Sequence, residues 1–239
     1  MIYSKIYEPR ISDYTKNGKL ALHSIINILE DITAHHSVSV NDNFIENSKN
    51  GLSWISVEWN VIIHKYPKTS EALYIDTWAT GTKASYVTYR EFLVKDKQGN
   101  VYINACEKLT MLDINAGKII RITPEMISMY EPEESVKYNF DFSKLQQPQK
   151  YDYSKPIYVR RTDIDYNNHV HNTKYLEYAI EAIPEKAYEE DGIKEFRIIY
   201  KKPVIVFDNI TLNYTAADNG HIISIFKEDN ELCTLIQFK

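Results

Sequence analysis

Glycine is scarce in this sequence, and no glycine-rich loop is present. Only 7 of the 239 residues are Gly, and neither a GxGxxG run nor a Walker-type sequence occurs. Such loops let the backbone approach a phosphate closely, so their absence argues against the common nucleotide-binding classes. Cysteine is rarer still, with only two residues. Cys106 and Cys233 each lie in an apolar run, which predicts two buried free thiols and not a disulfide framework.

An excess of positive charge and long apolar runs are also lacking. The chain has 28 Lys and Arg against 33 Asp and Glu, a net charge of −5. A nucleic-acid-binding face should be strongly basic, so the balance argues against that class of protein. No run approaches the roughly 18 apolar residues of a membrane span, and the N-terminus has no apolar signal region. We therefore expect a cytoplasmic protein without a membrane span.

Tyrosine and alternating apolar residues are abundant. The 19 Tyr residues, with 44% hydrophobic and 26% charged content, are typical of a soluble globular protein rich in strands. Apolar residues recur at helical spacing from Leu22 to Ile32 and predict one buried helix over 20–34. The other periodic segments predict strands over 2–10, 54–63, 73–80, 85–94 and 101–112. This order indicates an antiparallel sheet packed on one helix.

The second half of the chain repeats the first. After a Pro-containing connector, in which Phe140 and Phe142 suggest contact with a surface, the pattern predicts a strand over 151–160 and a helix over 173–183. Four more strands are predicted over 194–201, 210–215, 221–227 and 232–238. The spacing from Arg10 to Glu30 equals that from Arg161 to Glu181, so the copies superpose at an offset of 151.

The duplication predicts an α+β protein with a double hotdog fold. Each copy is a long helix wrapped by a curved antiparallel sheet. We expect an N-terminal repeat over residues 1–120, a connector over 121–150 and a C-terminal repeat over 151–239.

A polar segment stands just before the second helix. Asp165, Asn167 and His169 alternate, so their carboxylate, amide and imidazole can converge on one side of an extended or turning segment. Asn172 or Thr173 is the expected N-cap of the helix. Its unpaired N–H groups would suit a carbonyl oxygen or the oxyanion that it becomes.

Other interpretations of these residues stay open. The spacing of Asp163, Asp165 and Asn167 matches the opening of an EF-hand, but Asn168 and Lys174 replace the required Gly and Glu. Zinc at His169 and His171 would need further ligands. Asp, Asn and His also occur in turns simply because they bond local backbone. His35 and His36, in the first copy, could bind a ligand or interact with the helix dipole.

The order D-x-D-x-N-x-H-V-x-N-x-x-Y, from Asp163 to Tyr175, resembles the signature of the fatty acyl-acyl carrier protein thioesterases of bacteria and plant plastids. The resemblance continues through Glu181 to Pro184. In the first half it is carried by Leu29-Glu30-Asp31 through His36, Trp54, Lys65-Tyr66-Pro67, Asp76-Thr77-Trp78 and Lys95 through Gly99. It implies hydrolysis of acyl thioesters, with catalytic Asp165, Asn167 and His169 in the second repeat. It also implies that the first repeat contributes the acyl pocket.

One position departs from that family. The family usually has a Glu, often followed by Cys, after a Tyr and two basic residues, whereas Tyr200-Lys201-Lys202 is followed here by Pro203. Proline cannot accept a proton, so this role is absent or supplied from elsewhere. The conceivable substitutes are Glu177, Glu181 and Asp208.

The resemblance implies acyl carrier protein as the partner and neither a metal nor a cofactor. Because that carrier is acidic, basic residues near the tunnel mouth are candidate contacts. They are Arg160, Arg161, Lys174, Lys201 and Lys202. The acyl tunnel should be lined by the 20–34 helix and the 54–63 and 73–80 strands. Hydrolysis of acyl-CoA, non-catalytic acyl or carrier binding, and a homodimer remain open alternatives.

Overall fold

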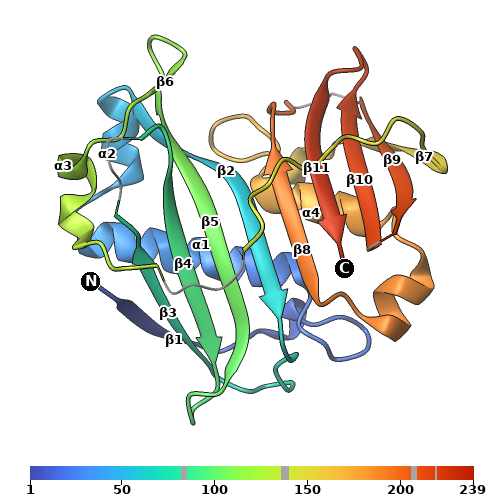
Figure 1. Ribbon diagram of the computed structural model, residues 1–239, viewed down its shortest axis with the longest axis horizontal. Helices are drawn as coiled ribbons and strands as arrows, with labels where there is room; N and C mark the ends of the chain where they lie inside the picture. The colour runs from blue at the N-terminus through green and yellow to red at the C-terminus, as the bar shows by residue number, and fades with distance from the viewer. Residues whose placement is uncertain (82–84, 136–139, 206–208, 219) are drawn as a thin grey trace. The chain divides into compact units, whose positions relative to one another are not determined.

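The chain folds into two compact units, Met1–Phe140 and Asp141–Lys239 (Figure 1). The computed structural model describes residues 1–81, 85–135, 140–205, 209–218 and 220–239. No helix among these residues is long and apolar enough to cross a bilayer.

Unit 1 is one long helix against an antiparallel sheet. The sheet order is β1-β3-β4-β5-β2, and the short strand β6 pairs with the last three residues of β5. The strands are β1 (Tyr3–Tyr7), β2 (Leu52–Ile63), β3 (Leu73–Ala79), β4 (Thr88–Lys95), β5 (Val101–Asp113) and β6 (Lys118–Ile120). The helical elements are η1 (Ile11–Asp13), α1 (Leu22–Ser39), α2 (Phe44–Lys49), α3 (Pro124–Ile127) and η2 (Ser128–Tyr130).

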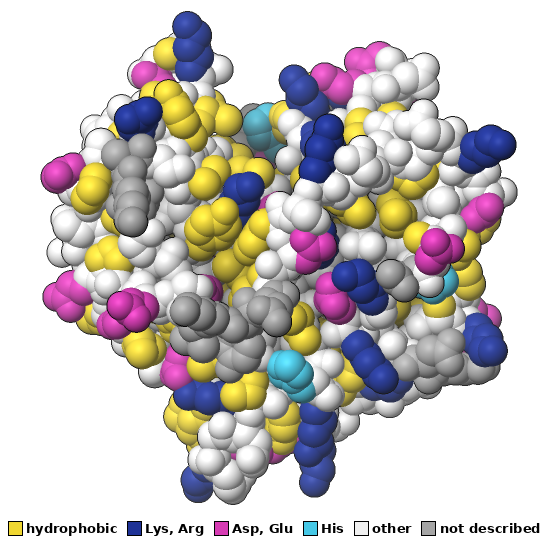
Figure 2. Space-filling model, viewed as in Figure 1, with side chains coloured by type: hydrophobic (Ala, Val, Ile, Leu, Met, Phe, Trp, Pro, Cys, Tyr) yellow, Lys and Arg dark blue, Asp and Glu magenta, His cyan; other side chains and the backbone are white. Residues whose placement is uncertain are grey.

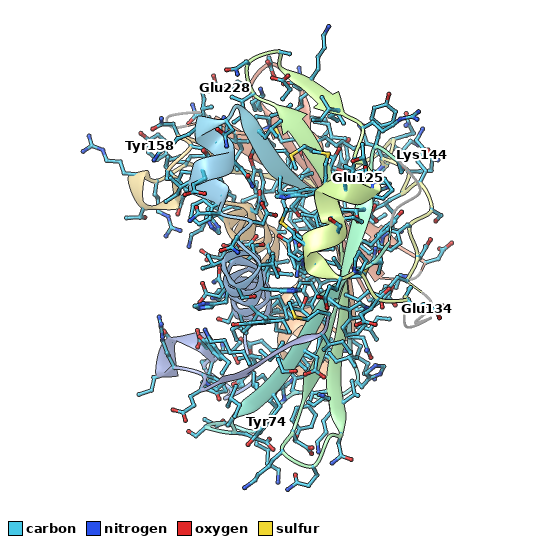
Figure 3. All side chains as sticks on the ribbon, turned by 90° about the vertical axis from the view of Figure 1, so that its left-hand side faces the viewer. Tyr74, Glu125, Glu134, Lys144, Tyr158 and Glu228 are labelled. Carbon is cyan, nitrogen blue, oxygen red and sulfur yellow. The ribbon has the colours of Figure 1, made fainter. Side chains whose placement is uncertain are left out.

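The apolar stripe of α1 explains why this helix is central to unit 1. Leu22, Ile25, Ile26, Leu29 and Ile32 are each at most 2% exposed. Burying a side chain of this kind stabilises a fold by roughly 1.5–3 kcal/mol. Figure 3 shows α1 on one side of the sheet, with the labelled Glu134 on the other. The helix continues five residues past the predicted end, and His36 lies in its last turn.

Unit 2 has the same arrangement. Its sheet order is β8-β11-β10-β9-β7, and every pairing within it is antiparallel. The strands are β7 (Tyr153–Tyr158), β8 (Glu195–Tyr200), β9 (Asn209–Ala217), β10 (Gly220–Lys227) and β11 (Leu232–Phe238). The helical elements are η3 (Arg161–Asp163), α4 (Asn172–Ile180) and η4 (Ala187–Asp191).

The duplication predicted from the sequence is confirmed, because the strand orders of the two units correspond one to one. The predicted offset of 151 is wrong by one residue. Arg10 and Asp13 flank η1 as Arg160 and Asp163 flank η3, and α1 begins at Leu22 as α4 begins at Asn172. The structural offset is therefore 150.

The start of unit 2 is held against its sheet by an ion pair. The guanidinium of Arg197, on β8, lies 3.2 Å from the Asp141 carboxylate and donates to the Ser143 carbonyl at 2.8 Å. The Arg197 side chain is 2% exposed. This part of the predicted connector is fixed to a surface, as the neighbouring aromatic residues suggested.

Candidate functional site

A buried carboxylate fixes the chain just before the polar loop. Asp163, 1% exposed, accepts hydrogen bonds from the backbone N–H and guanidinium of Arg160 and from the Tyr178 hydroxyl at 2.7 Å. Burial acts to raise the pKa of Asp163, but the bonds from Arg160 and Tyr178 outweigh it and hold the pKa below its ordinary value. Asp163 is therefore a charged structural anchor that joins η3 to α4.

The loop from Asp165 to His169 is a tight turn. The N–H of Asp165 donates to the His169 carbonyl at 2.8 Å, and the N–H of Asn168 donates to the Asp165 carbonyl at 3.1 Å. Asn168 has φ of +62°, which Asn tolerates better than most residues. The Asp165 Oδ1 atom accepts from the N–H groups of Asn167 and His169, at 2.8 and 3.1 Å. The turn thus brings Asp165, Asn167 and His169 onto one short loop.

One oxygen of the Asp165 carboxylate is therefore bonded to the loop backbone, as expected if Asp165 has a structural role in the turn. Asn167 is exposed and His169 is half-buried, so both side chains lie within reach of solvent. Their catalytic roles stay predictions.

Backbone hydrogen bonds of Val204 connect the segment after β8 to the residue that follows the loop and to α4. The Val170 N–H donates to the Val204 carbonyl at 2.8 Å, and the Val204 N–H donates to the Tyr175 hydroxyl at 2.9 Å. His169 forms an antiparallel bridge with Ile205. Pro203 directly precedes Val204 and is exposed.

Two of the conceivable substitutes for the carboxylate missing at Pro203 are engaged elsewhere. Glu181 follows the last residue of α4, about 15 Å along the helix axis from its start, and lies 3.4 Å from Lys155. The Glu177 carboxylate lies 2.6 Å from Lys174 and 3.8 Å from Arg160. The third substitute, Asp208, lies outside the described residues.

The N-cap of α4 is His171, not Asn172 or Thr173 as predicted. Its Nδ1 atom accepts the Thr173 N–H at 3.4 Å and lies 3.0 Å from the Thr173 hydroxyl. Imidazole is an unusual N-cap, so sequence reasoning missed it. Within the described ranges the Asn172 N–H has no acceptor, which leaves one donor at the helix start.

Burial dominates the electrostatic environment of the His171 imidazole. Burial lowers the pKa of His171 below its ordinary value, while the negative charge of Asp165 opposes that shift. The interaction with Asp165 also indicates that the second imidazole of the segment lies near the loop carboxylate. No group of three or more His, Cys, Asp or Glu in the described ranges could hold a metal ion.

The five predicted carrier contacts divide into two groups. Three are paired, because Arg160 bonds Asp163, Lys174 bonds Glu177, and Lys202 lies 3.6 Å from Glu231. Arg161 and Lys201 are exposed, and neither side chain has an ion-pair partner in the part of the chain that the structure describes. Over the strands of unit 2 visible in Figure 2, basic and acidic side chains are interspersed.

Fold and loop together define a double hotdog protein with an Asp, Asn and His turn at a helix start. Residues 1–130 match the acyl-ACP thioesterase N-terminal domain, and residues 146–234 match the acyl-ACP thioesterase C-terminal domain. Because these matches span most of the sequence, the chain belongs to the acyl-ACP thioesterase family.

Individual relatives agree with this assignment. The chain is 26% identical to the oleoyl-acyl carrier protein thioesterase 2 of Arabidopsis thaliana, over 90% of this chain and 66% of that protein. It is 22% identical to the dodecanoyl-[acyl-carrier-protein] hydrolase of Cinnamomum camphora, over 92% and 60%. The chain therefore spans less than two thirds of either relative.

A solved structure supports the double hotdog prediction. The acyl-ACP thioesterase of Bacteroides thetaiotaomicron aligns with a TM-score of 0.88 at 18% identity, covering 99% of this chain and 96% of that one. At this identity the likeness establishes the fold.

Proposed function

We propose that this protein hydrolyses the thioester of a fatty acyl chain carried on the phosphopantetheine arm of acyl carrier protein. The observation that carries the proposal is the turn of unit 2, in which the Asp165 carboxylate bonds the N–H groups of Asn167 and His169 beside the start of α4. A carboxylate, an amide and an imidazole are thus held within the seven residues before a helix N-terminus. Membership of the acyl-ACP thioesterase family supports the choice of substrate.

In the proposed reaction, His169 takes a proton from water as its oxygen attacks the acyl carbonyl carbon. Asp165 orients that water, and Asn167 positions water or substrate. The tetrahedral oxyanion accepts a hydrogen bond from the Asn172 N–H. As the intermediate collapses, the carbon–sulfur bond breaks and His169 returns its proton to the leaving thiolate. General acid–base groups contribute roughly 10²–10⁴ in rate, and a single oxyanion donor roughly 10²–10³.

The two units would divide the work. Unit 2 carries the loop, and the acyl chain would lie between α1 and the sheet of unit 1. The acidic carrier would contact Arg161 and Lys201, since Arg160, Lys174 and Lys202 already have carboxylate partners. Arg161→Glu should raise KM for the carrier severalfold at low salt with little change in kcat. Lys118→Glu, the same charge reversal on exposed β6, is its control.

Hydrolysis of purified acyl-acyl carrier protein tests the proposal. His169→Ala should lower kcat by about 10²–10⁴ without changing the unfolding midpoint. Lys19→Ala, at the corresponding position of unit 1, should leave kcat within about twofold. Equal activity of wild type and His169→Ala would remove the assignment. Acyl-CoA of the same chain length, measured in parallel, shows which carrier is preferred.

Pro203 favours one second candidate, a non-catalytic acyl-binding protein. The position has no carboxylate, and the engagement of Glu177 and Glu181 leaves neither of them an evident replacement. Tight binding of acyl-acyl carrier protein without release of the acid would support this candidate.

A further inference from the structure

A row of polar side chains crosses the helix-facing side of the unit 1 sheet. Arg90 on β4 is directly opposite Glu107 on β5, and Glu107 is directly opposite Trp59 on β2. Directly opposed residues of neighbouring strands project from the same face of a sheet. His36 of α1 reaches this face, because its Nδ1 lies 2.7 Å from a guanidinium nitrogen of Arg90. The row therefore lies beneath α1.

All four side chains are buried, yet each keeps one unpaired polar atom. His36 and Trp59 are 0% exposed, Arg90 is 4% and Glu107 is 5%. Within the described ranges no partner is found for Trp59 Nε1, His36 Nε2, Arg90 Nε or Glu107 Oε2. Buried polar groups are nearly always hydrogen-bonded, since leaving one unpaired costs its full desolvation. Four such atoms along one row of neighbouring residues are not explained by packing alone.

The unpaired atoms share a chemical preference. Because His36 Nδ1 accepts from Arg90, the proton of the neutral imidazole resides on Nε2. His36, Arg90 and Trp59 therefore each present one N–H donor, and Glu107 presents a carboxyl oxygen. A hydroxyl group can accept two of these bonds and donate one, and a carbonyl oxygen can accept two.

The Glu107 carboxyl group can either donate or accept a hydrogen bond, depending on its protonation state. Burial raises the pKa of Glu107 to about 7, against the opposing charge of Arg90, so both protonation states are accessible near neutral pH. Burial lowers the pKa of His36 to about 4, which keeps that imidazole neutral.

The Tyr130 ring lies against Arg90 and His36 at one end of the row, and the rest of the surroundings is apolar. The Trp59 and Phe92 rings lie 5.4 Å apart, and Leu29 and Ile32 of α1 are fully buried. A polar row set into an apolar interior is poorly matched to a plain hydrocarbon, because methylene groups would leave every donor unpaired.

We propose that Trp59, Glu107, Arg90 and His36 form a binding site for an oxygen-bearing group, a hydroxyl or carbonyl, on the acyl chain of the substrate. The proposal rests on the proposed function, which puts the acyl chain between α1 and the sheet of unit 1. The site selects a chain oxygenated at the depth of the row over a plain chain of equal length. A site built to bond an oxygen rejects the analogue that lacks it, since its own polar groups then stay unpaired.

The test is the ratio of kcat/KM for hydroxylated and plain acyl chains of equal length on acyl carrier protein, with the hydroxyl moved one carbon at a time. One position should exceed the plain chain by about tenfold or more. Glu107→Leu should reduce that ratio to within about twofold, and Trp59→Phe should lower it in part. Glu107→Gln, which keeps hydrogen-bonding atoms at nearly the same volume, should retain a measurable preference.

Trp78→Phe is the matched control. Trp78 also has a buried, unpaired indole nitrogen, but it neighbours Ala79, which is opposite Arg90, so its side chain projects from the other face of the sheet. Its substitution should leave the ratio unchanged.

The outcomes separate this proposal from the proposed function. Hydrolysis of plain chains with no preferred hydroxyl position overturns the polar site and leaves the thioesterase intact. If no thioester is hydrolysed, the proposed function fails. In that case, calorimetry with free hydroxylated and plain fatty acids tests the polar site independently of hydrolysis. Equal affinities for the two kinds of fatty acid would overturn the polar site.

Discussion

The loops before the two long helices have one backbone and two chemistries. In Thr15–Lys19 and Asp165–His169, the first N–H donates to the last carbonyl at 2.8 Å in both copies. Gly18 and Asn168 occupy the same position, with φ of +71° and +62°. The turn is therefore independent of the groups that would perform chemistry on it.

The side chains at the loop ends differ. Thr15 and Lys19 in unit 1 correspond to Asp165 and His169 in unit 2. The residue before each helix differs too, since Ala21 caps α1 without a side-chain bond and His171 caps α4 through its imidazole. Four of the five loop residues differ between the copies, and only Asn17 and Asn167 are the same, so the comparison teaches that one backbone turn accommodates very different side chains. Each copy then supplies the natural control for the other.

The largest effect should come from giving the second loop the residue of the first. Asp165→Thr removes the group proposed to orient water and should lower kcat by about 10²–10³. Thr15→Asp should leave kcat within about twofold. Steady-state hydrolysis of acyl-acyl carrier protein measures both. A comparable loss in the two variants would mean that the loops do not differ in function.

The next effect concerns the anchoring carboxylates. Asp163→Ala leaves the buried Tyr178 hydroxyl and Arg160 without their acceptor and should lower the free energy of unfolding by about 3 kcal/mol. Asp13→Ala should cost only about 1 kcal/mol, because half-buried Asp13 accepts from Tyr7 and the Arg10 backbone near solvent. Urea denaturation gives both values, and equal losses would contradict the ranking.

The two units also differ in the buried charged side chains on the strands beneath their helices, and this difference should give a pH effect on stability. The corresponding unit 2 strands, β10 and β11, bury Ser224 and Thr234 but no charged side chain among the described residues. In unit 1, the folded-state pKa of Glu107 is raised from 4.5 to about 7, so its contribution to stability falls as pH rises through that window. The pKa of His36 is lowered from 6.5 to about 4, so its contribution rises with pH from 4 to 6.5.

These opposing slopes should largely cancel between pH 4.5 and 6.5. Glu107→Gln removes the contribution that falls with pH, so the free energy of unfolding should then rise by about 2.5 kcal/mol from pH 4 to 6.5. Denaturation at a series of pH values measures the slope against wild type. Parallel curves for the two proteins would show that Glu107 does not titrate in this range.

The smallest effect tests the shared backbone directly. Gly18→Asn places a side chain at φ of +71°, where a Cβ would lie 3.2 Å from the Thr69 hydroxyl oxygen, and should destabilise the fold by about 1 kcal/mol. Asn168→Gly relieves the same conformation and should change stability by less than about 0.5 kcal/mol. Thermal unfolding resolves the difference. A large loss in Asn168→Gly would indicate a further role for that amide.

Much of the fold could be predicted because apolar periodicity alone distinguishes strands from helices. The offset between the copies could not be predicted, because residue identity alone allows Arg10 to be aligned with Arg161. The structure shows that Asp13 and Asp163 close the same turn, which makes Arg160 the counterpart of Arg10. The short helix α2 also escaped notice. Its signal was Asn43, whose side chain accepts the Ile45 N–H at 2.9 Å as an N-cap.

The turn that brings Asp165, Asn167 and His169 onto one loop could be predicted from their local order, while their catalytic roles stay predictions. Partners far apart in the chain were not. Nothing near Val204 in the sequence indicates a bond to Tyr175. Alternation places Glu107 on one face of β5, but it cannot tell that a charged residue lies inside.

Both backbone groups of Val204 are bonded, its N–H to the Tyr175 hydroxyl and its carbonyl to Val170. The segment beside Pro203 thus cannot separate from the loop without also losing its bond to α4. Local opening there requires a concerted fluctuation of helix, loop and strand. Deuterium uptake at the Val204 amide should therefore be as slow as in α4 itself.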